Sequence, residues 1–351
     1  MKQTTTNHFH TQAWVVWLIA AAILALSTRN PLYLILLLLV ARLVAVVCGR
    51  PDASFSLPLL KLGLFIMFFA TLLNALFVPV GSVVLFTLPD WPLIGGAVTL
   101  EAAVYGAING LVLWTLLAVF AAINQIVPTA DLVRLTPRAL RDLGVVILIA
   151  VTYVPETIQQ VQRIREAQAI RGNRLTHWRD WRAVLTPLLI SGLERAMILA
   201  ETMVARGYGA TADTEQSWRV RLLLLLALAL SFGGWVWSFW VGWPGWILLV
   251  LGLLLVAVWL WQAGQQVKVT RYRPQSWTTW DVGLIGTAVF PLIFLLLPWF
   301  DHSHLFYTPY PSLTIPPLDL LFAVALLCLA YPALIIQKSQ HKEAKGAKEQ
   351  R

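Results

Sequence analysis

The chain has 351 residues, of which 58% are hydrophobic and 12% are charged, and its formal net charge is +9. Soluble domains carry about 25% charged residues, so this composition excludes an ordinary soluble protein and indicates a membrane protein. The two cysteines lie at or within apolar stretches, which argues against a disulfide framework and against a cysteine metal cluster.

Eight apolar stretches are candidates for membrane spans, because roughly 20 apolar residues cross a bilayer core. In chain order they cover residues 13–26, 31–47, 62–80, 97–123, 222–241, 244–262, 282–300 and 318–337. The first is short, but no clean cleavage site follows it, so we interpret it as a retained span. Trp14 and Trp17 lie near a span end and are expected at the membrane interface. The predicted fold class is an all-α polytopic membrane protein with about eight transmembrane helices.

The basic residues fall in alternate loops. They occur at Arg50 and Lys61, then within 134–221, then within 268–273, and finally in the charged tail 338–351. The positive-inside rule places these loops and both termini in the cytoplasm, as expected for a multi-pass protein of the cell membrane. Arg29, between the first two predicted spans, is the one basic residue whose position disagrees with this topology. Because the positive charge follows topology, it does not indicate a nucleic-acid partner.

The stretch 125–221 is the long water-compatible part of the chain. It holds 13 of the 26 basic residues, and all 13 are Arg, whose fixed fork of donors suits pairing with a protein partner. Residues 145–154 are apolar but too short to span, and Pro155 is expected to end them. Two amphipathic cytoplasmic helices follow, at about 156–171 and 187–206, with Pro155 and Pro187 expected at their beginnings.

Both predicted helices end in Arg-Gly with a Glu five residues before the Arg. The two copies are Glu166 with Arg171-Gly172, and Glu201 with Arg206-Gly207. One Arg-Gly is explained by a helix C-cap, because Gly adopts the left-handed conformation and a cation complements the helix dipole. Five residues are about 140° of rotation, so this Glu and Arg do not face each other as an intrahelical pair. Two such ends therefore favour arginines that project into a neighbour's pocket.

At these positions the chain resembles the transmembrane T component of energy-coupling factor (ECF) transporters, the EcfT/CbiQ family, over about residues 28–220. These are ATP-driven importers of vitamins and of cobalt or nickel ions, and their two coupling helices each end in Ala-Arg-Gly. Ala205-Arg206-Gly207 matches this motif, whereas Ile170 stands where the family has Ala before Arg171. Other similar segments are 28–31, 128–135, 153–156, 163–168, Pro187 and 193–196.

The resemblance implies two ABC-type ATPases, each taking one arginine, and a small membrane S component that binds the substrate. It implies ATP and Mg in the ATPases and no cofactor bound by this chain. The implied ATPase-coupling residues are Arg171, Gly172, Ala205, Arg206 and Gly207, with support along the helices from Glu166, Ala169, Glu194, Arg195 and Glu201. We expect N-terminal membrane helices in 1–124, the coupling region in 125–221, C-terminal membrane helices in 222–337 and the tail in 338–351. The last pair of spans is expected to be an extension.

Four acidic or histidine positions outside this region are candidates for chemistry. Asp301, His302 and His304 could bind a metal ion in an external loop, although a solvated polar loop explains them more simply. Glu101, near the start of a span, is an intramembrane acid that we interpret as a wet or hydrogen-bonded end residue. No Gly-x4-Gly-Lys-Ser/Thr motif occurs, so ATP is expected to be hydrolysed by another chain.

The favoured hypothesis is a non-enzymatic coupling subunit of an ATP-driven importer. One alternative is a stand-alone secondary transporter or channel, which needs ionisable residues in mid-span or paired broken helices. Another is a membrane enzyme acting on lipid-linked substrates, which needs clustered acids or histidines at an interface. Dependence of transport on ATP distinguishes the coupling subunit from the secondary transporter or channel. Activity of the isolated chain would distinguish the membrane enzyme from both.

Overall fold

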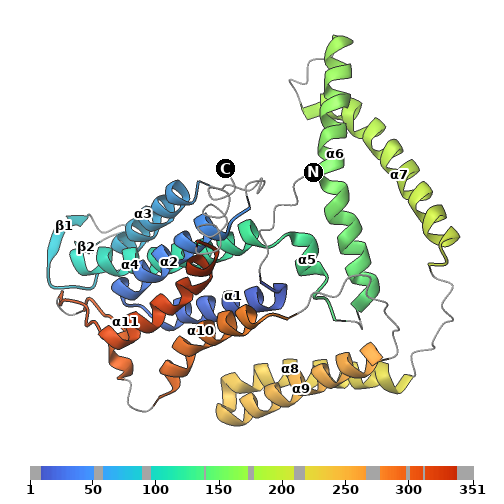
Figure 1. Ribbon diagram of the computed structural model, residues 1–351. Helices are drawn as coiled ribbons and strands as arrows, with labels where there is room; N and C mark the ends of the chain where they lie inside the picture. Colours follow the sequence, from blue (N-terminus) through green and yellow to red (C-terminus); the bar gives the residue numbers. More distant parts are fainter. Residues whose placement is uncertain are drawn as a thin grey trace, which may run out of the picture. The chain divides into compact units, whose positions relative to one another are not determined.

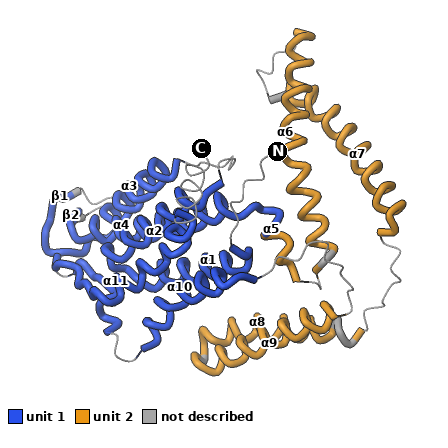
Figure 2. The backbone as a smooth tube through the Cα atoms, viewed as in Figure 1, with its two compact units in different colours: residues 1–131, 273–351 blue, residues 132–272 orange. Residues whose placement is uncertain are grey.

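The structure is a computed structural model that describes most of the chain (Figure 1). The described residues are 9–50, 58–88, 96–137, 140–172, 178–208, 218–265, 277–297, 301–310 and 313–337. The chain forms two compact units, one made of residues 1–131 and 273–351 and the other of residues 132–272 (Figure 2). The first unit thus joins the two ends of the chain, and the second holds its middle.

The first unit is a helical bundle with one small hairpin. Its helices are α1 (Thr11–Ser27), α2 (Pro31–Cys48), α3 (Leu59–Phe77), α4 (Leu100–Ile126), α10 (Thr279–Leu296) and α11 (Leu320–Leu327). The strands β1 (Val84–Leu88) and β2 (Gly96–Thr99) pair antiparallel between α3 and α4, a feature that the sequence analysis did not predict. The short α5 (Thr129–Val133) lies where the units meet in sequence.

Close helix packing in this unit depends on glycines. A Cβ added at Gly106 of α4 would lie 2.6 Å from the Ala70 carbonyl oxygen of α3, and one at Gly110 would lie 2.6 Å from Met67 Cα. Small residues let helix backbones approach each other in a membrane, where packing rather than hydrophobic burial drives association. The glycines therefore set the close approach of α3 and α4.

The last two spans are part of this bundle. α10 packs against α1, and α11 packs against α2. Trp17 Nε1 donates to the Leu329 carbonyl at 3.0 Å, and the backbone N–H of His10 donates to the Asp281 carboxylate at 2.5 Å. Trp14 and Trp17 are 1% and 0% exposed, so the prediction that these two rings lie at the membrane interface is wrong. They fill the core between the N-terminal and C-terminal helices instead.

The turn between α1 and α2 also links the two ends of the chain. Asn30, which is fully buried, accepts from Leu32 N–H as the N-cap of α2. Its Nδ2 also donates to the carbonyls of His304 and Pro317, at 3.0 and 2.6 Å. Arg29 N–H donates to the Leu305 carbonyl at 2.9 Å. The segment expected to be an extension thus satisfies the buried polar groups of this turn.

The second unit contains two helix pairs. Its helices are α6 (Arg141–Ile170), α7 (Arg182–Ala205), α8 (Trp218–Val241) and α9 (Trp243–Gln265), and a 3-10 turn (Trp178–Trp181) precedes α7. α8 packs closely on α9, where a Cβ on Gly252 would lie 2.5 Å from Ser231 N. α6 and α7 form the other pair and carry the site described below.

Both prolines that were expected to begin helices lie inside them. α6 is 30 residues long and contains Pro155 in its interior, so the predicted break at Pro155 is wrong. α7 begins at Arg182, so the predicted start at Pro187 is also wrong. Each proline removes one backbone hydrogen bond, which costs about 3 kcal/mol in a helix interior. At Pro187 the freed carbonyl of Ala183 accepts from Gln168 Nε2 of α6 at 3.3 Å, so a side chain replaces the lost donor.

Nine helices of the described chain are long and apolar enough to cross a membrane. They include α6 and α7, which were not among the predicted spans, while α1 falls just short with 17 residues. The protein is thus a multi-pass, helical membrane protein.

Candidate functional site

Helices α6 and α7 are joined by polar contacts that keep a constant antiparallel register. Glu156 Oε1 pairs with Arg195 Nη1 at 2.6 Å, and Gln160 Nε2 donates to Ser191 Oγ. From the first contact to the second, the partner residue moves four positions forward along α6 and four positions back along α7. The contact between Gln168 and Ala183 has the same register, eight positions further along. We call these three contacts the polar ladder. None of its glutamines was identified from the sequence, because only the register shows what they face.

The two Arg-Gly ends lie at opposite ends of this antiparallel pair (Figure 1). Extending the register of the polar ladder puts Arg206 level with about residue 145 of α6. The roughly 26 residues from there to Arg171 rise about 40 Å at 1.5 Å per residue. One contact at the far end agrees with this register, because Tyr208 Oη donates to Asp142 Oδ1 at 3.2 Å.

Both Arg-Gly ends have the same cap geometry. Gly172 and Gly207 each have φ of 80°, the left-handed conformation that closes a helix. Gly172 N–H donates to the Ala169 carbonyl at 3.0 Å, and Gly207 N–H donates to the Val204 carbonyl at 2.9 Å. At the second end Tyr208 N–H also donates to the Met203 carbonyl at 2.9 Å, which completes a Schellman motif. The predicted C-caps are therefore present in the structure.

The side chains around both ends point to water or to a partner, not to the fold. Arg171 and Arg206 are exposed, and so are the neighbouring Ala169 and Ala205. A Cβ at either glycine would meet nothing within 4 Å. The predicted supporting residues Glu166, Glu194 and Glu201 are also exposed, whereas Arg195 belongs to the polar ladder. The structure thus presents two exposed, capped arginine ends and brings none of the more distant predicted residues to them.

Trp181 was not identified from the sequence but braces the first end. The guanidinium carbon of Arg165 lies 6.0 Å from the centre of the Trp181 ring, within the range of a cation–π contact. Trp181 lies in the 3-10 turn that leads into α7. The contact therefore ties the last turns of α6 to the start of α7.

The loop with Asp301 and its two histidines has a structural role. Asp301 Oδ1 accepts from Ser303 N–H at 2.9 Å and caps the 3-10 turn His302–Leu305. This backbone hydrogen bond holds the pKa of the Asp301 carboxyl below its usual value. His302 Nε2 lies 2.9 Å from the Leu295 carbonyl. Across the described ranges, no three His, Cys, Asp or Glu side chains gather as a possible metal site.

Glu101 anchors the hairpin that precedes α4. Its carboxylate is fully buried and accepts from Ser82 N–H at 3.0 Å, Ser82 Oγ at 2.7 Å and Val83 N–H at 3.0 Å. The interpretation as a hydrogen-bonded end residue agrees with these contacts, although the side chain is not wet. Because the carboxylate already accepts hydrogen bonds from the hairpin segment, it is not available to bind a transported ion.

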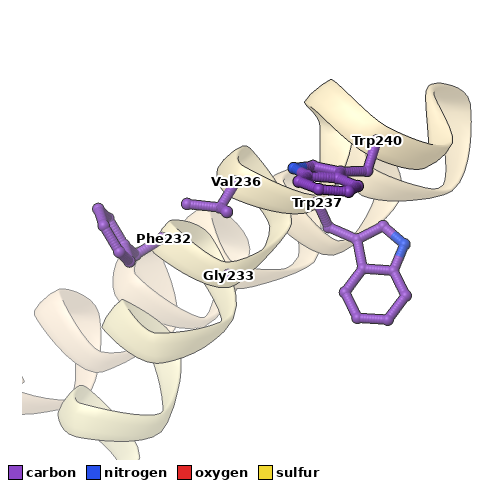
Figure 3. A pocket seen from close by; sticks show the side chains of 5 residues that line it. All are labelled: Phe232, Gly233, Val236, Trp237 and Trp240. Atoms are coloured by element: carbon purple, nitrogen blue, oxygen red, sulfur yellow. The ribbon is translucent and has the colours of Figure 1, made fainter.

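One hollow lies along α8, with a volume of about 540 Å³ (Figure 3). It is lined by Phe232, Gly233, Val236, Trp237 and Trp240, all from one helix. A small-molecule site needs a few polar groups that fix the ligand's orientation, and this surface offers only apolar and aromatic side chains. Such a surface suits lipid tails on a membrane helix.

Two comparisons show which known proteins this chain is similar to. The sequence model of the CbiQ family, described as cobalt transport protein, matches residues 3–218, a range that includes both Arg-Gly ends. The chain is also 33% identical over 103 residues to the energy-coupling factor transporter transmembrane protein EcfT of Exiguobacterium sibiricum. That similarity covers 25% of this chain and 39% of the relative. The family match covers more than half of the chain, and the protein therefore belongs to the CbiQ family of membrane transport components.

Proposed function

We propose that this chain is the non-enzymatic transmembrane coupling subunit of an ATP-driven importer of the ECF type. Two ABC-type ATPases bind its arginine ends, and a small membrane S component binds the substrate, a vitamin or a transition-metal ion. ATP and Mg are held by the ATPases. The coupling pair α6–α7 and both chain termini face the cytoplasm. Although α6 and α7 are long and apolar enough to span, an antiparallel pair that crossed the membrane would put Arg171 and Arg206 on opposite sides, where two ATPases on one side could not bind both. The name of the EcfT relative supports the type of transporter.

The observation that carries this proposal is the pair of matched arginine ends at opposite ends of one braced helix pair. A separation of roughly 40 Å is too large for one pocket and suits two neighbouring subunits. Arg171 and Arg206 are exposed on caps of the same geometry, so each can enter a groove without rearranging its helix. Guanidinium groups bind carboxylates and carbonyls through two parallel hydrogen bonds, which gives a firm hold on a moving partner.

The polar ladder explains how motion passes from one end to the other. The contacts of Glu156, Gln160 and Gln168 fix α7 on α6 at three levels along their length. When ATP binding draws two ATPases together, the ends they hold are displaced. Because the ladder resists sliding, the pair tilts as a unit and moves the membrane components packed against it.

The stand-alone transporter is less well supported. In the described part of the chain, Glu101 and Asp281 are the buried side chains among Asp, Glu, Lys, Arg and His, and both lie in the first turn of a helix. Glu101 is engaged by the hairpin, and Asp281 Oδ2 accepts from Thr278 N–H and Oγ1, both at 2.8 Å. A proton or ion relay instead places such groups in mid-span.

The test is purification of the tagged full chain from its native membranes in mild detergent, with mass spectrometry of the proteins that accompany it. We expect two ATPase subunits and a small membrane protein with the native chain. The Arg171→Ala/Arg206→Ala variant is expected to lose the ATPases while still inserting normally. The matched control, Lys61→Ala/Arg163→Ala, removes two exposed cations that lie away from both caps, and this variant should keep the ATPases. Recovery of the ATPases with both variants contradicts the proposal.

A further inference from the structure

One end of the first unit carries a single basic side chain. The α1–α2 turn, the start of α4 and the loop after α10 come together there, because Arg29 Nη1 donates to Tyr105 Oη at 2.8 Å and the Arg29 N–H donates to the Leu305 carbonyl. Residues 62–133 and 274–337, which include the other two segments, contain no Lys or Arg. In the described part of the chain, no carboxylate lies within ion-pair distance of Arg29. The charge of Arg29 is therefore not compensated by a described acid.

The turn around Arg29 fixes the backbone from which this side chain projects. Thr28 Oγ1 and the Arg29 N–H both donate to the Leu305 carbonyl, at 3.0 and 2.9 Å. Thr28 and Asn30 have extended backbones and are 3% and 0% exposed, whereas Arg29 between them is exposed. Successive side chains of an extended segment point to opposite sides. Burial of the two flanking residues therefore directs Arg29 out of the fold.

Tyr105 adds a second donor beside the guanidinium. Its oxygen accepts from Arg29, so its own proton is available to another group. Its ring packs on that of Tyr310, with 5.7 Å between the ring centres, which holds it in place. The guanidinium has further N–H groups, and in the described part of the chain no side chain accepts from them. Arg29 and Tyr105 thus present oriented donors and one positive charge.

The surface next to these donors is apolar. Leu26 in the last turn of α1 is 66% exposed, and Leu32 in the first turn of α2 is 38% exposed. Phe306, which follows the residue bound by the Arg29 backbone, is 55% exposed. A cation with phenolic donors beside exposed leucines matches the two parts of a phospholipid, its phosphate and its acyl chains. A free anion would use only the first part.

From these contacts we propose that Arg29 and Tyr105 bind the phosphate of a membrane phospholipid whose acyl chains lie on Leu26 and Leu32. The planar guanidinium fits two phosphate oxygens at once, and tyrosine is favoured at the level of the headgroups. An anionic phospholipid is preferred, because its headgroup has no ammonium group to be repelled by Arg29. The inference needs only that this end of the bundle reaches a membrane surface, so it goes beyond the coupling role and does not depend on it.

Photolabelling of the full chain in lipid nanodiscs tests this inference. The discs contain phosphatidylcholine and a small share of phosphatidylglycerol that carries a photoreactive group on one acyl chain. After irradiation, mass spectrometry compares labelling at Leu26 and Leu32 with labelling at Phe65 and Phe68 of α3. These two phenylalanines are 64% and 65% exposed and serve as the reference for unspecific contact with lipid. We expect labelling of the two leucines to exceed that of the reference.

Variants of Arg29 separate specific binding from general contact. Arg29→Gln should reduce the ratio of leucine to reference labelling by about tenfold, because a charge-assisted pair of hydrogen bonds is lost. Arg29→Lys keeps the charge but loses the planar fork, so its ratio should fall less. Both variants keep the backbone hydrogen bond to Leu305. Lys61→Gln, which removes an exposed cation at the opposite end of α3, is the control and should leave the ratio unchanged.

The remaining outcomes distinguish a lipid from a free anion and from the proposed function. Excess inorganic phosphate should leave the ratio unchanged, since it has no acyl chains. If inorganic phosphate abolishes the excess labelling, the site binds a free anion and the lipid is overturned. If the native ratio is uniform, or if Arg29→Gln labels as the native chain does, the inference fails. Absence of ATPases from the purified chain would contradict the proposed function and leave this inference standing.

Discussion

Replacement of Asn30 tests whether the C-terminal helices are an integral part of the bundle. Asn30 is fully buried and makes three hydrogen bonds, one as the N-cap of α2 and two to the carbonyls of His304 and Pro317. Loss of an N-cap costs about 1 kcal/mol. Leaving a buried carbonyl without a donor costs about 1–3 kcal/mol. With two such carbonyls, we therefore expect Asn30→Ala to reduce the free energy of unfolding by about 3–7 kcal/mol.

The assay is thermal unfolding of the full chain in detergent, followed by tryptophan fluorescence. For a chain of 351 residues, a loss of this size corresponds to a fall in the unfolding midpoint of roughly 4–10 °C. Asn30→Asp separates the two contributions, because a carboxylate keeps the cap but cannot donate to the two carbonyls. It should therefore be almost as damaging as Asn30→Ala. Asn124→Ala, at an exposed side chain, should change the midpoint by less than about 1 °C. If Asn30→Asp is as stable as the native chain, the C-terminal loop does not hold the turn.

Three further predictions concern the same bundle. Gly81→Ala should destabilise the hairpin by about 2 kcal/mol or more, because φ is 149° and the new Cβ would lie 2.4 Å from the Glu101 carboxylate; protease cleavage near residue 85 should then become faster. Trp17→Phe should lower the free energy of unfolding by about 1–3 kcal/mol in the thermal assay, since it removes the buried indole N–H that donates to the Leu329 carbonyl. The backbone hydrogen bond from Ser303 holds the folded pKa of Asp301 below its usual value, so the cap is fully stabilising above the unfolded pKa of about 4 and is lost as the pH falls through the folded pKa. Hydrogen exchange of its 3-10 turn should accordingly show loss of protection only in acid, and Asp301→Asn should remove that dependence.

The apolar stretches predicted most of the membrane helices. α2, α3, α4, α8, α9 and α10 all lie close to the predicted spans, because a run of apolar residues long enough to cross a bilayer has few other uses. The hairpin of β1 and β2 was missed because its strands of five and four residues lie at a span end, where apolar residues are also expected. Trp14 and Trp17 were misplaced because a tryptophan near a span end can face either lipid or a neighbouring helix, and sequence alone does not choose.

The predicted starts of the two site helices were wrong for a different reason. Proline has a strong local preference for helix starts, and that preference led to the wrong boundaries at Pro155 and Pro187. The donor that replaces the lost bond at Pro187 comes from Gln168, which lies on another helix and cannot be paired with it from local sequence. The caps at Gly172 and Gly207 were predicted correctly because their signal is local, an Arg-Gly at the end of an amphipathic stretch.

The most direct measurement of the central claim is the affinity of the purified ATPases for the detergent-solubilised full chain. Each arginine is expected to contribute about 1.5–3 kcal/mol through charge-assisted hydrogen bonds. Arg171→Ala/Arg206→Ala should therefore raise Kd by roughly two to four orders of magnitude, since each 1.4 kcal/mol is a factor of ten. Lys61→Ala/Arg163→Ala should stay within about threefold of the native value, because a general loss of two positive charges away from the caps is screened by salt. If the two double variants bind equally well, or equally poorly, the arginine ends do not hold the ATPases.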